Sequence, residues 1–410
     1  MGLKIGISGV GQFSPSFIPI FQAHPAVEEV VLADVVPERR VQFARRFGIK
    51  RMFASHDELC HSDVDAICIF TQRWMHAQQA IQALRAGKHV YSAVPAAIAL
   101  DEMGELVETV KQTGLTYMVG ETSYYYPVTI FCRQKFAAGE FGHYVYGEAE
   151  YIHDMDVGFY DAYRYSGGET WKQTASFPPM LYPTHSVSMI LSVTGARMTD
   201  VACFGYVDRE NDGVFQADVS LWGNAFSNET ALFRTSDGGS ARINELRRVG
   251  YHASPEVRMS LFGTLGRFET QTNPLSGLHP ERNASVWYHK PADRTEDLTE
   301  LLTCDPPGYP DDAQTHVSKH LHAGMFSGLS GVHDVARLPA TFQGLPNGHE
   351  GSHQFLVLDF IDAIVGGKQP PNNVWFAARC CLPGITAHES AKRGGELLKV
   401  PDFGDPPPGA

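Results

Sequence analysis

The sequence predicts an α/β protein of two units: an N-terminal doubly wound parallel sheet and a C-terminal α+β unit with a large, mostly antiparallel open sheet. Strand-like and helix-like segments alternate in the first part of the chain, whereas strand-like segments follow one another in the second. The length of 410 residues agrees with this division, since a domain averages about 150 residues. We place the boundary after residue 125, so the predicted units span 1–125 and 126–410.

In the N-terminal part, short apolar runs alternate with segments of helical periodicity. This order and spacing are typical of βαβ units, whose strands pair in parallel. The expected strands are Leu3–Ser8, Val30–Asp34, Ala66–Phe70, His89–Ala93 and Thr116–Gly120, and the expected helices are Glu38–Phe47, His76–Ala86 and Leu100–Gln112.

In the C-terminal part, apolar runs are separated by Gly, Asn, Asp and Ser without intervening helices, which favours antiparallel pairing. Residues 304–350 show no clear period and are expected to form a long excursion. Two final helices, Gln354–Val365 and Phe376–Gly394, are expected to pack back toward the first unit. The expected strands are Tyr146–His153, Asp200–Val207, Phe215–Trp222, Glu229–Arg234, Ala241–Leu246 and Val257–Phe262.

Composition excludes several classes of protein. Acidic residues outnumber basic ones by 46 to 33, giving a net charge of −13, which argues against binding nucleic acid through overall charge. No apolar stretch reaches the length of a membrane span, and no signal peptide precedes the first predicted strand. The seven cysteines show no CxxC spacing, so no zinc site is indicated. We expect a cytoplasmic protein without a metal ion.

The motif Gly9-x-Gly11 directly follows the first predicted strand, where a dinucleotide-binding Rossmann fold makes its phosphate-binding turn. In that turn, the first glycine permits the tight bend and the second lets the backbone approach the pyrophosphate. Ser14 takes the third position of the fingerprint and is small, although it is not glycine. We count Gln12 and Phe13, within the same turn, among the predicted cofactor-binding residues.

Asp34 ends the second predicted strand, where a carboxylate can bind the two hydroxyls of a ribose. The same carboxylate would repel a 2′-phosphate, which favours NAD over NADP. Arg39 and Arg40 lie nearby and keep NADP open as an alternative. An ordinary strand–turn–helix without any ligand is the other interpretation of this segment.

The segment Val64–Thr71, together with His76 and the run Ala86–Val90, resembles the glucose–fructose oxidoreductase/inositol dehydrogenase (Gfo/Idh/MocA) superfamily. The resemblance implies an NAD(P)-binding Rossmann domain followed by an α/β domain whose open sheet often forms oligomer contacts. Thr71 and His76 match family positions near the nicotinamide and the adenine-side phosphates. A homodimer or homotetramer is therefore expected.

The chain departs from this family at the end of the fifth strand. Most members carry Glu-Lys-Pro there, and the lysine relays the proton of the oxidised hydroxyl. This sequence has Ala93, Val94 and Pro95, of which only the proline is retained. Valine can neither exchange a proton nor donate a hydrogen bond. These residues are still predicted to contact the cofactor, and either the hydroxyl proton leaves by another route or the protein is not a conventional dehydrogenase.

A second departure is Tyr182-Pro-Thr-His185, where ordinary members have an aspartate about four residues before the histidine. On a helix, positions i and i+3 share one face, so the phenol and the imidazole are expected to reach one substrate. Together with Ala149–Asp154, these motifs look like the NAD-dependent glycoside hydrolases of the superfamily, the branch known for α-N-acetylgalactosaminidase activity. That branch usually retains the glutamate that is Ala93 here.

The resemblance implies redox-neutral hydrolysis of a glycoside through transient oxidation at C3, loss of the C2 proton, elimination, addition of water and reduction. Histidine suits the proton transfers because its unperturbed pKa is near neutrality. The candidates are His185 for proton transfer, Tyr182 as its partner or as the C2 base, His153 as the next base, Tyr124 on the sugar pocket, and Glu121 facing the nicotinamide–substrate cleft. The alternative roles of these side chains are structural: capping a helix or packing in the protein core.

Two other functions stay open. One is a conventional NAD-dependent sugar or cyclitol dehydrogenase with a relocated proton relay, in which Lys172 could replace the lost lysine. The other is a catalytically inactive NAD-binding sensor. His349 and His353 are expected in a loop near the cleft, and no role is assigned to the histidines at positions 316, 320 and 322.

Overall fold

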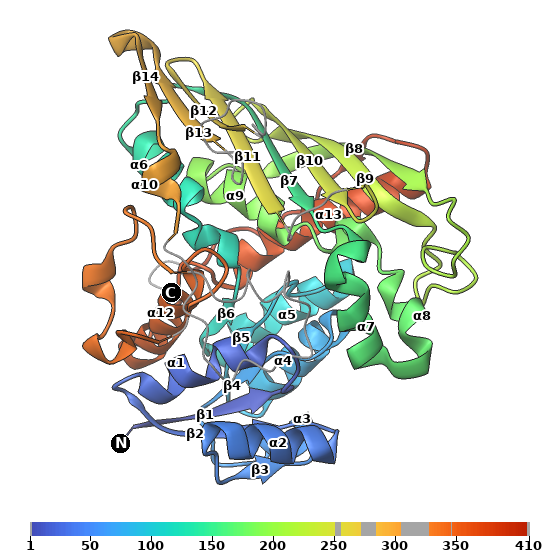
Figure 1. The fold of residues 1–410 in the computed structure, drawn as a ribbon, viewed down its shortest axis with the longest axis vertical. Helices are drawn as coiled ribbons and strands as arrows, with labels where there is room; N and C mark the ends of the chain where they lie inside the picture. The colour runs from blue at the N-terminus through green and yellow to red at the C-terminus, as the bar shows by residue number, and fades with distance from the viewer. Residues whose placement is uncertain (1, 251–255, 272–283, 305–327, 346, 408–410) are drawn as a thin grey trace.

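Two β-sheets organise the chain, and they lie in the lower and upper parts of the view in Figure 1. The computed structural model describes residues 2–250, 256–271, 284–304, 328–345 and 347–407. The predicted fold class is confirmed: a parallel sheet in the N-terminal half precedes a larger, mostly antiparallel sheet. No helix in these ranges is long and apolar enough to cross a membrane.

The first sheet has six parallel strands in the order β3-β2-β1-β4-β5-β6, which is the strand order of a Rossmann fold. Glycines in the left-handed region end two of its helices, Gly48 after α2 and Gly114 after α5. The strands are β1 (Leu3–Ser8), β2 (Val27–Ala33), β3 (Met52–Phe53), β4 (Ala66–Ile69), β5 (His89–Ser92) and β6 (Tyr117–Val119), and the helices are α1 (Ile18–Ala23), α2 (Pro37–Phe47), α3 (His56–Cys60), α4 (His76–Arg85) and α5 (Leu100–Thr113).

The second sheet has nine strands in the order β14-β13-β12-β11-β7-β10-β9-β8-β15. Only β7 and β10 pair in parallel, and all other neighbours are antiparallel. The strands are β7 (Tyr144–Ile152), β8 (Met198–Val207), β9 (Phe226–Thr235), β10 (Ser240–Leu246), β11 (Glu256–Gly263), β12 (Gly266–Gln271), β13 (Ala284–His289), β14 (Arg294–Asp297) and β15 (Leu398–Lys399).

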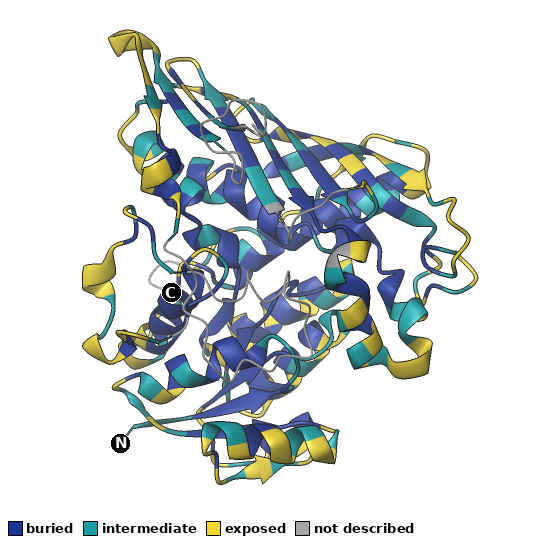
Figure 2. Ribbon diagram, in the orientation of Figure 1, coloured by how far each residue is buried: buried dark blue, intermediate teal, exposed yellow. Residues whose placement is uncertain are grey.

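In the described ranges, seven further helices lie outside the first βα units. They are α6 (Pro127–Ala137), α7 (Tyr160–Gly167), α8 (Trp171–Ala175), α9 (Thr184–Thr194), α10 (Thr299–Leu302), α12 (Ser352–Gly366) and α13 (Val374–Lys392). Among them, α9 packs on β7, β10 and β11, while α13 packs on β8. The C-terminal helices return to the first unit: α12 contacts α1, and α13 contacts both α5 and α9. Buried residues concentrate in the strands and in these central helices (Figure 2).

The structure differs from the elements expected from the sequence at three places. The run Phe215–Trp222 is not a strand, because Phe215 adopts a positive φ of 56° and packs with Met155 and Phe159 beside α7 rather than in the sheet. The segment after Gly11 is not one helix but a 3₁₀ turn, Ser14–Ser16, followed by the short α1. The strands β12 to β15 were missed, and of these β14 and β15 have only four and two residues, too few to show an alternating pattern.

Candidate active site

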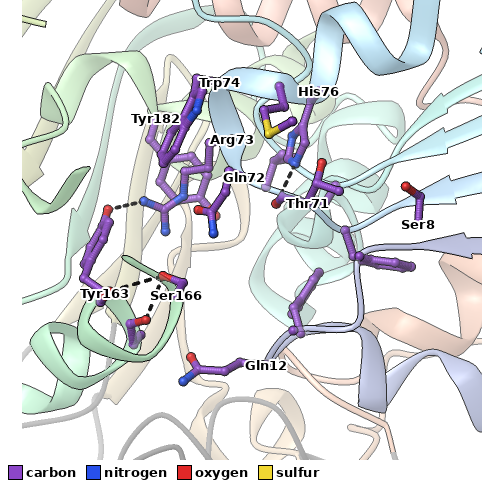
Figure 3. A pocket seen from close by; sticks show the side chains of 18 of the residues that line it. Ser8, Gln12, Thr71, Gln72, Arg73, Trp74, His76, Tyr163, Ser166 and Tyr182 are labelled. Carbon is purple, nitrogen blue, oxygen red and sulfur yellow. Dashed lines mark hydrogen bonds between the residues drawn. The ribbon is translucent and has the colours of Figure 1, made fainter. Parts of the chain in front are cut away.

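A cavity of about 630 Å³ lies between the carboxyl ends of the first sheet and the second unit (Figure 3). In doubly wound folds, ligands bind at this edge of the sheet. Most of the predicted site residues meet on its wall: Gly9, Gly11, Gln12, Phe13, Asp34, Thr71, His76, Ala93, Val94, His153, Tyr182 and His185. Three predicted residues do not line it: Pro95, Glu121 and Tyr124.

The turn after β1 leaves its backbone accessible to a ligand. Gly9 has a φ of +87°, and a Cβ there would lie 2.9 Å from the carbonyl carbon and oxygen of Phe70. A Cβ on Gly11 would meet no atom within 4 Å, so the backbone borders open space. The Nε2 atom of Gln12 is buried without a hydrogen-bond partner among the described residues. A bound dinucleotide fits this turn, because its oxygens can accept from such a donor.

Asp34 is held at the end of β2 by two backbone groups. The amide of Val10 donates to Oδ2 at 2.9 Å, and the amide of Val36 donates to Oδ1 at 2.8 Å. Each carboxylate oxygen keeps a further acceptor site for a ribose hydroxyl. Arg39 lies 3.9 Å from Oδ2 and stacks on the ring of Tyr165. The carboxylate is therefore oriented before any cofactor binds.

The imidazole of His76 lies within hydrogen-bonding distance of two loops of the cavity wall. Its Nδ1 lies 2.9 Å from the carbonyl oxygen of Pro95, and its Nε2 lies 3.2 Å from that of Thr71. Burial lowers the pKa of His76. Pro95 thus supports His76 from behind, while Ala93 and Val94 form the wall itself. The wall is aliphatic at the position where the resemblance described above implies a lysine.

Three side chains form a hydrogen-bonded chain at the wall of the cavity. The hydroxyl of Tyr182 lies 3.2 Å from Nε2 of His185, and Nδ1 of His185 lies 2.6 Å from Oε1 of Glu121. An ionised carboxylate only accepts, so Nδ1–H donates to Glu121; in neutral His185, Nε2 then accepts from the phenol. Only Tyr182 and His185 border the cavity, and Glu121 lies beneath them.

Local structure orients these three side chains. Glu121 follows β6, and its Oε1 also accepts from the amide of Ser123 at 2.9 Å. Burial alone would raise the pKa of Glu121, but His185 and the hydrogen bonds lower it. The ring of Tyr151 packs edge-on against His185 with centroids 5.2 Å apart. Burial raises the pKa of Tyr182 to about 12, so its phenol is protonated at neutral pH.

The prediction that Tyr182 and His185 lie on one face of a helix is wrong. Tyr182 precedes α9, which begins at Thr184, and has non-helical dihedrals of −134° and 52°. The turn is held against α13, where a Cβ on Gly384 would lie 2.1 Å from the carbonyl oxygen of Met180. Only glycine allows this close approach, so α13 determines where the phenol lies.

His153 lies just beyond β7, on the cavity wall. Its ring packs on Phe159 with centroids 3.7 Å apart, and its Nδ1 is buried without a hydrogen-bond partner in the described ranges. Burial, followed by the charges of Arg247 and Arg73, lowers the pKa of His153 well below its usual value. His153 is therefore a neutral side chain with one nitrogen available to a ligand.

Tyr124 and Lys172 lie away from the cavity. The ring of Tyr124 packs against Tyr125, Phe376 and the guanidinium of Arg133, so this tyrosine does not line a sugar pocket. The ammonium of Lys172 donates to the carbonyl of Asp212 at 2.6 Å and does not replace the missing lysine.

His349 reaches the cavity, whereas His353 lies behind it. Nδ1 of His349 is 2.9 Å from Nε2 of His353, whose ring stacks on Phe17 with centroids 4.2 Å apart. The histidines at positions 316, 320 and 322 lie outside the described residues. Within the described part of the chain, no group of three or more His, Cys, Asp or Glu could hold a metal ion.

The sequence analysis missed several wall residues, of which Arg73 is the most informative. Arg73 lies between Thr71 and His76, in the connection from β4 to α4, and projects toward Tyr163 and Tyr182 (Figure 3). Its position after a parallel strand was the available signal. Glu350 also lines the wall, but nothing in the local sequence indicates that its loop reaches this cavity.

Comparison with known proteins identifies the class. Residues 3–121 match the oxidoreductase family with an NAD-binding Rossmann fold. This match covers the predicted first unit and confirms the predicted resemblance to the Gfo/Idh/MocA superfamily. The chain is thus an enzyme of NAD-binding type, in agreement with the geometry of the Gly9–Gly11 turn and Asp34.

Two relatives and one solved structure are similar to this chain over nearly its whole length. Two proteins named glycosyl hydrolase family 109 protein align with 98% of this chain: one from Saccharopolyspora erythraea, 28% identical with 83% of its length covered, and one from Streptomyces niveus, 23% identical with 77% covered. Among solved structures, levoglucosan dehydrogenase in complex with NADH and levoglucosan superposes with a TM-score of 0.72 at 18% identity, covering 98% of this chain and all of that one. The latter likeness concerns the fold.

Proposed function

We propose that this chain is an NAD-dependent, carbohydrate-active enzyme that hydrolyses glycosides without net oxidation. The observation that carries the proposal is the Tyr182–His185–Glu121 relay, which opens onto the same cavity as the Gly9–Gly11 turn. The two relatives named glycosyl hydrolase family 109 proteins, which align with 98% of this chain, support it.

When bound, NAD supplies a reversible acceptor for a hydride from a sugar carbon. Oxidation of the C3 hydroxyl to a ketone acidifies the neighbouring C2–H, so a base can remove that proton while the C1 substituent leaves. Water then adds to the unsaturated sugar, and return of the hydride restores the hydroxyl. The cycle therefore has no net redox change and does not need the usual pair of carboxylates.

The chain's own residues handle the protons. The phenol of Tyr182 passes its proton to Nε2 of His185 as it takes one from the substrate, which overcomes the high pKa of an isolated phenol. Glu121 holds His185 in the accepting tautomer and stabilises its cationic form. It is thus a positioning residue, and the apolar Val94 adds no competing proton donor.

A conventional sugar or cyclitol dehydrogenase is the second candidate. Net oxidation of a sugar hydroxyl needs only one acceptor for the hydroxyl proton, and the Tyr182–His185 pair supplies that acceptor. Hydrolysis also requires an acid for the leaving group, whereas His153, the neighbouring candidate, resists protonation in its buried position. This property of His153 favours the second candidate.

The two functions are separated by incubating the protein with NAD and a panel of aryl α- and β-glycosides in deuterated water. The proposal predicts release of the phenol, with deuterium at C2 of the sugar and no accumulation of NADH. Cleavage with the C2 proton retained would contradict the elimination route. Accumulation of NADH from free sugars without glycoside cleavage would establish the dehydrogenase instead.

A further inference from the structure

Arg73 is a cation that faces the cavity with most of its hydrogen-bonding capacity unused. Its side chain is half-buried, and one guanidinium nitrogen donates to the hydroxyl of Tyr163 at 2.5 Å. No carboxylate of the described residues lies within ion-pairing distance of it. A guanidinium carries five N–H donors and stays charged at any working pH. Four of its donors therefore lack a protein acceptor in the described ranges.

Aromatic rings surround this cation. Its central carbon lies 4.5 Å from the ring centre of Tyr182, 5.3 Å from that of Phe159 and 5.9 Å from that of Phe177. Such rings stabilise a cation in part, but they offer no lone pairs in place of lost water. An oxyanion would satisfy both the charge and the free donors.

The position of Arg73 assigns it to the substrate rather than to the cofactor turn. Arg73 lies beside Tyr182 and Tyr163, on the side of the cavity opposite Gln12 (Figure 3). The orphaned Nδ1 of His153 belongs to the same wall. A substrate that reaches the hydroxyl of Tyr182 therefore also comes within reach of this guanidinium.

We propose that Arg73 binds a carboxylate of the substrate, so that the sugar acted on is a uronic acid. The inference rests on the proposed function for the reaction but concerns a different contact. A planar guanidinium offers two parallel N–H groups that match the two oxygens of a carboxylate. One unpaired cation balances one negative charge, which favours a carboxylate over a phosphate dianion.

The other charges of the site agree with this assignment. The nearby buried Arg247 is already paired with Glu245 at 2.8 Å. Among the described residues, the carboxylates on the cavity wall are Asp34, at the cofactor turn, and Glu350, from the loop before α12. Neither lies within 4.0 Å of Arg73, so neither neutralises it.

The test compares matched pairs of 4-nitrophenyl glycosides with the NAD-loaded protein: glucuronide against glucoside, and galacturonide against galactoside. Glycosides of the 6-sulfate and 6-phosphate sugars complete the series. We expect kcat/KM to favour a uronide by at least about 10-fold, the scale of a charge-assisted hydrogen bond. In Arg73→Met this preference should vanish, and in Arg73→Lys it should fall to an intermediate value.

Arg164→Met is the matched control, because Arg164 is an exposed arginine on α7 that pairs with Asp161 outside the cavity. It should leave the preference unchanged. Retained NAD binding shows that each variant is folded. Equal turnover of uronide and neutral glycoside by the original protein, or an equal loss of both in Arg73→Met, would overturn the inference while leaving the proposed function intact. Preference for a sulfated or phosphorylated sugar would overturn the assignment to a carboxylate.

Calorimetric titration with free glucuronate, galacturonate, glucose and galactose separates this inference from the reaction. If no glycoside is cleaved, the proposed function fails, but uronate binding that is lost in Arg73→Met still supports the carboxylate site. Absence of any uronate binding, or binding that survives in Arg73→Met, would contradict it.

Discussion

Nδ1 of His185 lies 2.6 Å from Oε1 of Glu121, and both side chains are almost completely removed from solvent. The two residues come from different units: Glu121 follows the last strand of the parallel sheet, and His185 lies in the first turn of α9. This contact links the end of the parallel sheet to the Tyr182–His185 pair on the cavity wall.

Replacing Glu121 by Gln should lower kcat by about 10²–10⁴-fold with little change in KM, because the amide no longer stabilises a cationic His185 or enforces its tautomer. Steady-state kinetics on any cleaved glycoside measures this. Glu229→Gln is the control, since Glu229 forms a similar pair with His388 at 2.8 Å away from the cavity. Equal losses of kcat in the two variants would show that Glu121 acts only through stability.

Replacing Tyr182 by Phe should reduce kcat by about 10²–10⁴-fold, the contribution of a positioned acid or base. The ring and its packing remain, so NAD binding followed by fluorescence should be unchanged. Tyr124→Phe provides the comparison, because Tyr124 does not border the cavity and should keep nearly full activity. A fully active Tyr182→Phe would exclude the relay.

Replacing Asp34 by Asn should weaken NAD binding by about 10–100-fold and raise the relative affinity for NADP, because the charge that binds a ribose diol and repels a 2′-phosphate is lost. Fluorescence titration with both cofactors gives the two affinities. Asp65→Asn is the matched control, since Asp65 also accepts a backbone N–H at the sheet but lies outside the cavity. An unchanged NAD/NADP ratio in Asp34→Asn would refute this role.

Stability should decrease as the pH falls below about 6.5, in part through His349. Burial, with the charge of His185 second, lowers the pKa of His349 from 6.5 to about 3. Between these values the unfolded chain binds a proton that the folded protein does not, so this group costs up to about 1.4 kcal/mol of unfolding free energy per pH unit.

Urea unfolding of the protein and of His349→Asn at several pH values between about 5 and 7 measures this contribution. Asn tolerates the positive φ of 46° at this position. The variant should show a shallower fall of stability toward acid, whereas His61→Asn, on the surface, should follow the original protein. Parallel curves for the original protein and His349→Asn would contradict the assignment.

Much of the fold follows from local patterns. The strand Leu3–Ser8 agrees at both ends, and the helices α2, α4 and α5 agree to within one residue, because buried parallel strands and amphipathic helices leave clear periodicities. The apolar run Phe215–Trp222 has the composition of a strand, but its side chains are buried against α7, a contact that composition does not encode.

Part of the predicted site also follows from local sequence patterns, and part depends on tertiary contacts. Placing the Gly9–Gly11 turn and Asp34 together needs only the order of strand, turn and strand, because parallel strands end at one edge of the sheet. The predicted homodimer or homotetramer and the domain boundary after residue 125 stay predictions.

The motif Tyr182-Pro-Thr-His185, read against the resemblance to the superfamily, was enough to single out these two residues as candidates. Which groups act on them depended on the packed chain: Glu121 lies beneath His185, Arg73 lies over the ring of Tyr182, and Gly384 lets α13 press the turn into place. These contacts join residues far apart in sequence, and such distances are closed by the packing of helices between two sheets rather than by any local preference.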